Sequence, residues 1–110
     1  MRRAAKTLLI TLTRRSGPVA EFVASPLTPA TDDTLSFTDQ STGSPTSWLW
    51  EKNSGGGWSA FSAQSTTRNP SATAITLLGG SGIFSVRLTA TNASGSNTRT
   101  RTDYITVVAP

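Results

Sequence analysis

Short segments in which apolar and polar residues alternate constrain the fold of this chain more than any other feature. The clearest is IFSVRLTATN at 83–92, where Phe84, Val86, Leu88 and Ala90 take every second position. Successive side chains of a β-strand point to opposite sides, so strict alternation indicates a strand with one buried face. The segment therefore predicts a strand packed on a core.

Comparable segments recur along the chain, and Gly, Pro, Asn and Ser separate them about every ten residues, which is typical of a β-sandwich. They are VAEFVASP (19–26), DTLSFTDQS (33–41), TSWLWEKN (46–53), TTRNPSATAITLL (66–78) and TRTRTDYITVV (98–108). We expect an all-β, antiparallel sandwich of about seven strands, with 74–78 in a strand and GGSG (79–82) as a hairpin turn. Trp50, Phe37 and Phe84 are expected in its core, because large rings dominate small cores.

Composition excludes several kinds of chemistry. The chain has 110 residues, the size of one domain, and contains no cysteine and no histidine. A histidine-dependent catalytic triad and a cysteine or histidine zinc site are therefore excluded. We expect no enzymatic activity, no cofactor and no metal. We also expect no membrane span, because no apolar run reaches the required length.

The positive charge is concentrated at the start of the chain. The formal net charge is +4, yet residues 1–15 hold five of the ten basic residues and none of the six acidic ones. The remaining residues therefore carry about −1. We divide the chain into a basic N-terminal arm at 1–17 and a sandwich domain at 18–110.

The arm contains a strand-like segment of its own, Thr7–Thr13. Its apolar run is shorter than a secretion signal requires and is interrupted by threonines. Such a strand can pair with an edge of its own sandwich or add to the sheet of a neighbouring subunit. The residues expected to bind a partner are Arg2, Arg3, Lys6, Leu8, Ile10, Leu12, Arg14 and Arg15.

Two aromatic residues lie on or beside a glycine-rich loop at 55–57. Trp58 and Phe61 are candidates for contact with a protein or a glycan, and the alternative is that they cover one end of the core. Arg87, Arg99 and Arg101 are expected on outward-facing strand positions. Direct nucleic-acid binding is not expected, because the domain is nearly neutral.

Several segments, in this order, resemble the polycystic-kidney-disease (PKD) domain family. They are PVAEFVASP, LSFTDQSTGSPTSWLW, RNPSAT and FSVRLTATNASGSNTRTRTDYITV, within residues 18–108. The resemblance implies an immunoglobulin-like sandwich with Trp50 as its core tryptophan, and a role as a spacer or interaction module. The sequence EKNSGGGW replaces the acidic, glycine-containing turn usual in the family, so features that depend on that turn are not implied.

These observations favour a non-enzymatic structural protein. The expected role is a bacteriophage virion component, either a capsid decoration or a tail-associated subunit, assembled in the host cytoplasm. Its expected partners are a capsid or tail protein and further copies of the chain itself. The alternative is a secreted or cell-surface adhesion module that binds a glycan through the loop aromatics.

Overall fold

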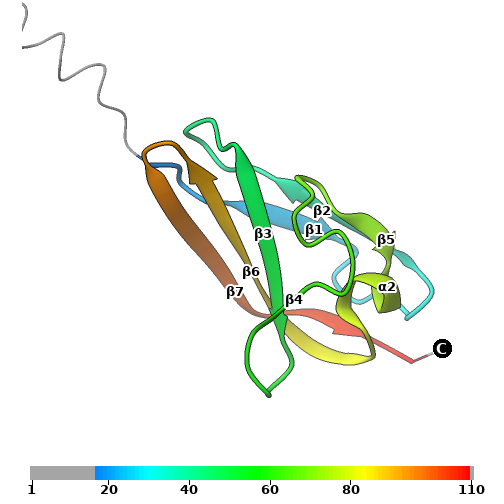
Figure 1. The fold of residues 1–110 in the computed structure, drawn as a ribbon. Coiled ribbons are helices and arrows are strands. Elements are labelled where there is room, and N and C mark those ends of the chain that lie inside the picture. Colours follow the sequence, from blue (N-terminus) through cyan, green and yellow to red (C-terminus); the bar gives the residue numbers. More distant parts are fainter. Residues whose placement is uncertain (1–16, 110) are drawn as a thin grey trace, which may run out of the picture.

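Two antiparallel sheets packed face to face form the domain (Figure 1), and the computed structural model describes residues 17–109. The three-stranded sheet has the order β1 (Phe22–Ser25), β2 (Thr34–Asp39), β5 (Ser71–Thr73). The four-stranded sheet has the order β4 (Ser59–Ala60), β3 (Ser47–Asn53), β6 (Gly82–Asn92), β7 (Gly95–Val107). The predicted all-β sandwich of about seven strands is confirmed.

The strand order is that of an immunoglobulin-type Greek key. Strands β1, β2 and β5 correspond to A, B and E, and β4, β3, β6 and β7 to C′, C, F and G. After β1 the chain crosses to the second sheet, where 27–31 runs beside the end of β7. There Thr106 donates its N–H to the Leu27 carbonyl (2.9 Å), and Val108 donates to that of Pro29 (2.9 Å).

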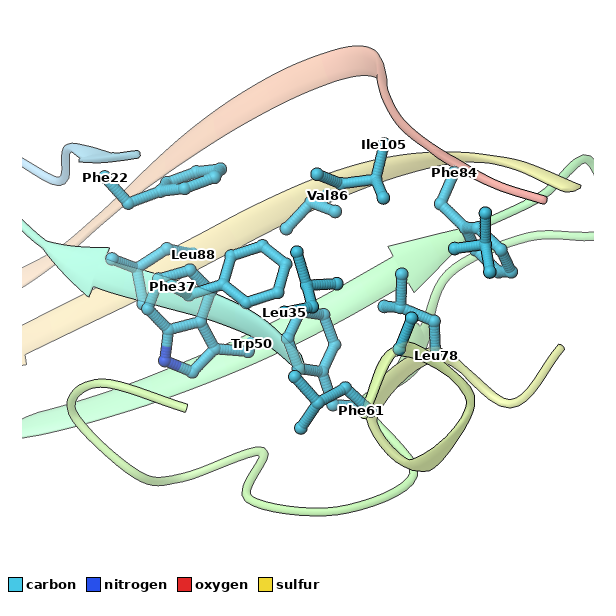
Figure 2. Close-up of a cluster of buried hydrophobic side chains, with 13 residues drawn as sticks. Phe22, Leu35, Phe37, Trp50, Phe61, Leu78, Phe84, Val86, Leu88 and Ile105 are labelled. Carbon is cyan, nitrogen blue, oxygen red and sulfur yellow. The ribbon is translucent and has the colours of Figure 1, made fainter. Parts of the chain in front are cut away.

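The core lies between the sheets and is centred on Trp50 (Figure 2). The Trp50 side chain is fully buried, and its ring centroid lies 5.1 Å from that of Phe22 and 5.2 Å from that of Phe37. Its indole Nε1 donates to the Thr67 carbonyl at 2.8 Å, so the buried N–H has a partner. Phe37 and Phe84 are also buried, as predicted.

Residues 74–78 form a short helix, α2 (Ala74–Leu78), and the predicted strand at this position is wrong. The Thr73 hydroxyl accepts the Thr76 N–H at 3.4 Å, which caps the start of the helix. Gly79, with φ of 87°, ends the helix and donates its N–H to the Ile75 carbonyl. The predicted hairpin turn at 79–82 is therefore also wrong, because this segment connects a helix to β6.

Candidate functional site

Strand β7 forms one edge of the four-stranded sheet, and its first half directs main-chain groups away from the sheet. The Thr91 carbonyl accepts the Thr46 N–H at 2.7 Å, so the main chain of Thr91 faces the β3 side. Hydrogen-bonding direction alternates along a strand, so Asn92 faces β7 and pairs with Gly95. The same alternation directs the N–H and C=O groups of Ser96, Thr98 and Thr100 outward.

The outer edge of β7 is occupied only in part. Near its end, Thr106 and Val108 bond to 27–31, as described above. From Ser96 to Thr102, no strand within residues 17–109 pairs on the outer side, and Ser96–Thr100 are exposed. We call Ser96–Thr102 the open edge.

Other sheet edges are covered by the protein itself. At β5, the Gln64 amide donates to the Ser71 carbonyl (3.0 Å) and accepts the Ser71 N–H (2.9 Å), as a neighbouring strand would. Strand β4 has two residues, and beyond it Trp50 donates its N–H to the Ser65 carbonyl at 2.8 Å. Short and covered edges resist pairing with other chains.

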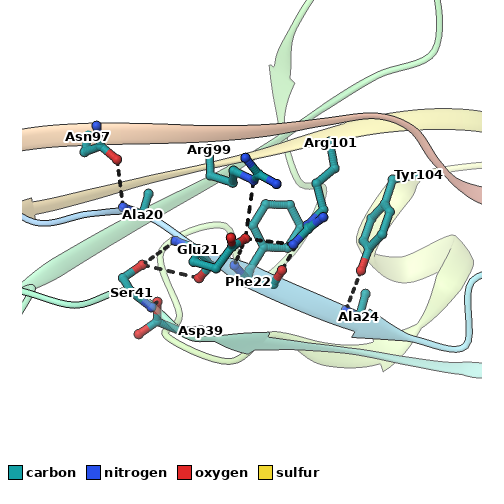
Figure 3. Close-up of polar contacts among 10 residues, drawn as sticks. All are labelled: Ala20, Glu21, Phe22, Ala24, Asp39, Ser41, Asn97, Arg99, Arg101 and Tyr104. Atoms are coloured by element: carbon teal, nitrogen blue, oxygen red, sulfur yellow. Dashed lines mark hydrogen bonds and ion pairs between the residues drawn. The ribbon is translucent and has the colours of Figure 1, made fainter.

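The edge of β1 is covered by side chains from β7 (Figure 3), and we call this set of contacts the clasp. Its bonds run from Ala20 N–H to Asn97 Oδ1 (2.8 Å), from Ala24 N–H to Tyr104 Oη (3.0 Å), and from Arg101 Nε to the Phe22 carbonyl (3.0 Å). The clasp closes one margin of the sandwich without a continuous strand pairing.

Glu21 supplies the negative charge of the clasp. Its Oε1 atom lies 2.8 Å from Arg101 Nη2 and 3.3 Å from Arg99 Nε. The Phe22 N–H, which donates to the same oxygen at 2.9 Å, lowers the pKa of the Glu21 carboxyl, and both guanidinium groups lower it further against an opposing effect of desolvation. Glu21 therefore contacts both positive charges beside the open edge and offsets one of them.

The prediction that Arg99 and Arg101 face outward is wrong. They lie opposite Leu88 and Val86, whose side chains are buried, so they share the inward face of the sheet. Local alternation could not show this, because a register shift in the β6–β7 pairing lies between Arg101 and the buried Ile105. Among the residues of the clasp, Glu21, Asn97 and Tyr104 were not predicted as functional.

The outer face of the four-stranded sheet carries Trp58. The guanidinium carbon of Arg87 lies 4.4 Å from the centroid of the Trp58 ring, and Arg87 Nε lies 2.8 Å from Glu51 Oε1. Arg87 faces outward, as predicted, because it pairs with Glu51 across β3 and β6. The Trp58 ring is half-buried and remains a candidate contact residue.

The second candidate on this loop, Phe61, lies in the core. It is 4% exposed, and its ring centroid is 5.0 Å from that of Phe37 and 5.9 Å from that of Trp50. Of the two roles considered for this residue, partner contact and core covering, the structure therefore gives Phe61 the second. Phe61 and Trp58 therefore do not form one exposed surface.

The predicted arm residues lie outside the described part of the chain, but the point where the arm joins the domain is well defined. They are Arg2, Arg3, Lys6, Leu8, Ile10, Leu12, Arg14 and Arg15. A Cβ at Gly17 would lie 3.6 Å from the Gly95 carbonyl carbon, and one at Gly43 only 2.8 Å from Pro18 Cα. The arm therefore joins the domain between two turns, next to the start of the open edge.

Residues 17–109 contain no group of three or more His, Cys, Asp or Glu side chains that could hold a metal ion. In this part of the chain, no helix is both long enough and apolar enough to cross a membrane. The chain matches no protein-family model, and no curated protein matches its sequence.

Proposed function

We propose that this protein is a non-enzymatic structural module with a PKD-like sandwich, which joins a bacteriophage virion through its N-terminal arm. It serves there as a capsid decoration or a tail-associated subunit, present in several copies. The observation that carries the proposal is the separation of the chain into a complete sandwich and a basic arm.

Two features support this separation. Within residues 17–109, the buried hydrophobic residues run from Ala20 to Val107 and fill the space between the two sheets. The five basic residues of 1–15 stand against a remainder of about −1, so the charge able to steer the protein to an acidic surface lies in the arm. An arm of this kind carries the residues that attach the domain to its neighbours.

Virions produced from the genome that encodes the chain test the proposal. Tagged full-length protein should co-sediment with the particles, whereas a variant without residues 2–16 should not. A second variant, with Arg2, Arg3, Lys6, Arg14 and Arg15 changed to Ser, should incorporate weakly at every salt concentration, whereas incorporation of the wild-type chain should fall as salt rises, because salt screens charge attraction. Lys52→Ser, which removes a positive charge from the sandwich, is the matched control. Equal incorporation of the full chain and the shortened chain would contradict the proposal.

A glycan-binding or adhesion role is the second candidate, and the position of Trp58 favours it. The ring is half-buried on the outer face, and Arg87 holds it in place. An ordered aromatic ring offers a flat apolar surface for the face of a sugar, and the neighbouring ion pair offers hydrogen-bonding groups. This role would place the protein at a cell surface or outside the cell.

A glycan array separates the two candidates. Trp58→Ala should abolish any glycan binding of the full chain, while Trp58→Phe should retain part of it because the ring is kept. Binding that is equal in the wild-type chain and in Trp58→Ala would exclude this site.

A further inference from the structure

We propose that the open edge, Ser96–Thr102, receives the segment Thr7–Thr13 of a second copy of this chain as an added strand. The inference rests on the proposed function, since it names the surface on which the arm is received. Copies linked in this way share one continuous sheet across each contact.

The first argument is the difference between this edge and the others. Gln64 covers β5, the clasp covers β1, and β4 is only two residues long. Exposed strand edges attract other chains, and natural sandwiches shield them. Within residues 17–109 no strand covers the open edge, and Glu21 offsets one of the two positive charges that Arg99 and Arg101 place beside it.

The second argument is the fit between edge and segment. Each is seven residues long, a strand length of about 23 Å. On the outer face of the sheet, hydroxyl pairs join β6 to β7 at Thr89–Thr98 (2.9 Å) and Thr91–Ser96 (2.9 Å). The threonines of the segment share one face, so an added strand extends this row, and cross-strand Thr pairs are favourable.

Charge supplies the third argument. Asp103, at the end of the open edge, is exposed and has no ion-pair partner within residues 17–109. The segment has Lys6 before it and Arg14 after it. A basic residue therefore meets Asp103 whichever direction the added strand takes.

The position of Gly17 favours the arm of a neighbour over the protein's own arm. Gly17 is packed beside Gly95, and only residues 14–16 separate it from Thr13. To reach its own open edge, the arm would have to reverse direction within these residues, with Arg14 and Arg15 in the turn. The arm of a second copy needs no such reversal.

The experiment uses two full-length variants and their mixture, followed by sedimentation velocity. Thr98→Pro removes an N–H that an added strand needs, while the fold tolerates it because this N–H points away from β6. Ile10→Pro damages the donating segment. We expect the wild-type chain to self-associate and each variant to associate at least about tenfold more weakly.

An equimolar mixture of the two variants should form heterodimers, because Thr98→Pro still donates an arm and Ile10→Pro still offers an edge. Thr98→Val keeps the N–H and loses only the hydroxyl that pairs with Thr89, so its association should lie between that of the wild type and that of Thr98→Pro.

Three outcomes would overturn the inference. In the first, Thr98→Pro associates as strongly as the wild type. In the second, the wild-type chain remains monomeric at all concentrations, whatever the rate of amide hydrogen exchange at Ser96–Thr100. If Thr98→Pro fails to fold, Ile10→Pro tests the inference by itself. It should weaken association and speed amide hydrogen exchange at Ser96–Thr100 relative to the wild type, and equal association and exchange would then overturn the inference in place of the first outcome. If Thr98→Pro enters virions normally while the chain without residues 2–16 does not, this inference fails and the proposed function stands.

Discussion

Glu21 shows how a single carboxylate closes the margin of a sandwich. One of its oxygens accepts a main-chain N–H of β1 and contacts two guanidinium groups of β7 (Figure 3). The two strands belong to different sheets, so the contact joins the layers where no strand pairing does. The Glu21 side chain is 37% exposed, so solvent weakens these ion pairs.

We predict that Glu21→Gln lowers the free energy of unfolding by about 0.5–1 kcal/mol at pH 7. The pKa of the Glu21 carboxyl is lowered in the folded protein from its ordinary value near 4.5. Its contribution is therefore complete above pH 4.5 and is lost as pH falls through the folded pKa. Urea unfolding of both chains from pH 7 to pH 3 measures this, and the difference should shrink at the acid end.

Asp32→Asn is the matched control for this prediction. Asp32 is exposed and has no ion-pair partner within residues 17–109, so its removal should leave the free energy of unfolding nearly unchanged at pH 7. A difference between wild type and Glu21→Gln that stays constant from pH 7 to pH 3 would mean that the charge of Glu21 does not stabilise the clasp.

At the scale of elements, alternation in the sequence predicts the long strands well. Strands β2 and β6 each bury every second residue, and this is a local pattern. Helix α2 was missed because five residues give too short a pattern to separate a helix from a strand. Its caps, Thr73 and Gly79, were the available signal.

The open edge could not be predicted from local pattern. Whether a strand lies at an edge depends on which segments pair with it, and β7 pairs with β6 and then with 27–31. The same non-local arrangement turns Arg99 and Arg101 toward Glu21. A repeat such as TRTRT shows that alternate residues share a face, but only the pairing of Arg99 with Leu88 and of Arg101 with Val86 shows which face is turned inward.

At the scale of the whole molecule, most of the excess positive charge and the buried core lie in different parts of the chain. The core is built from residues 20–107, while half of the basic residues lie in 1–15. The buried core of the described part and the basic residues of the arm therefore occupy separate stretches of the sequence. Substitutions in the arm should then alter attachment without altering the stability of the sandwich, and the two properties are independent.

This independence leads to the final prediction, on the chain shortened to begin at Gly17. At concentrations where the full chain is monomeric, both chains should have the same free energy of unfolding within about 0.5 kcal/mol. Their charges should nevertheless differ, so at pH 7 the full chain binds a cation exchanger and the shortened chain, at about −1, does not. Urea unfolding and ion-exchange retention measure the two properties separately. A shortened chain that loses more than about 1 kcal/mol would mean that the arm completes its own sandwich, since one strand at the open edge would supply several main-chain hydrogen bonds.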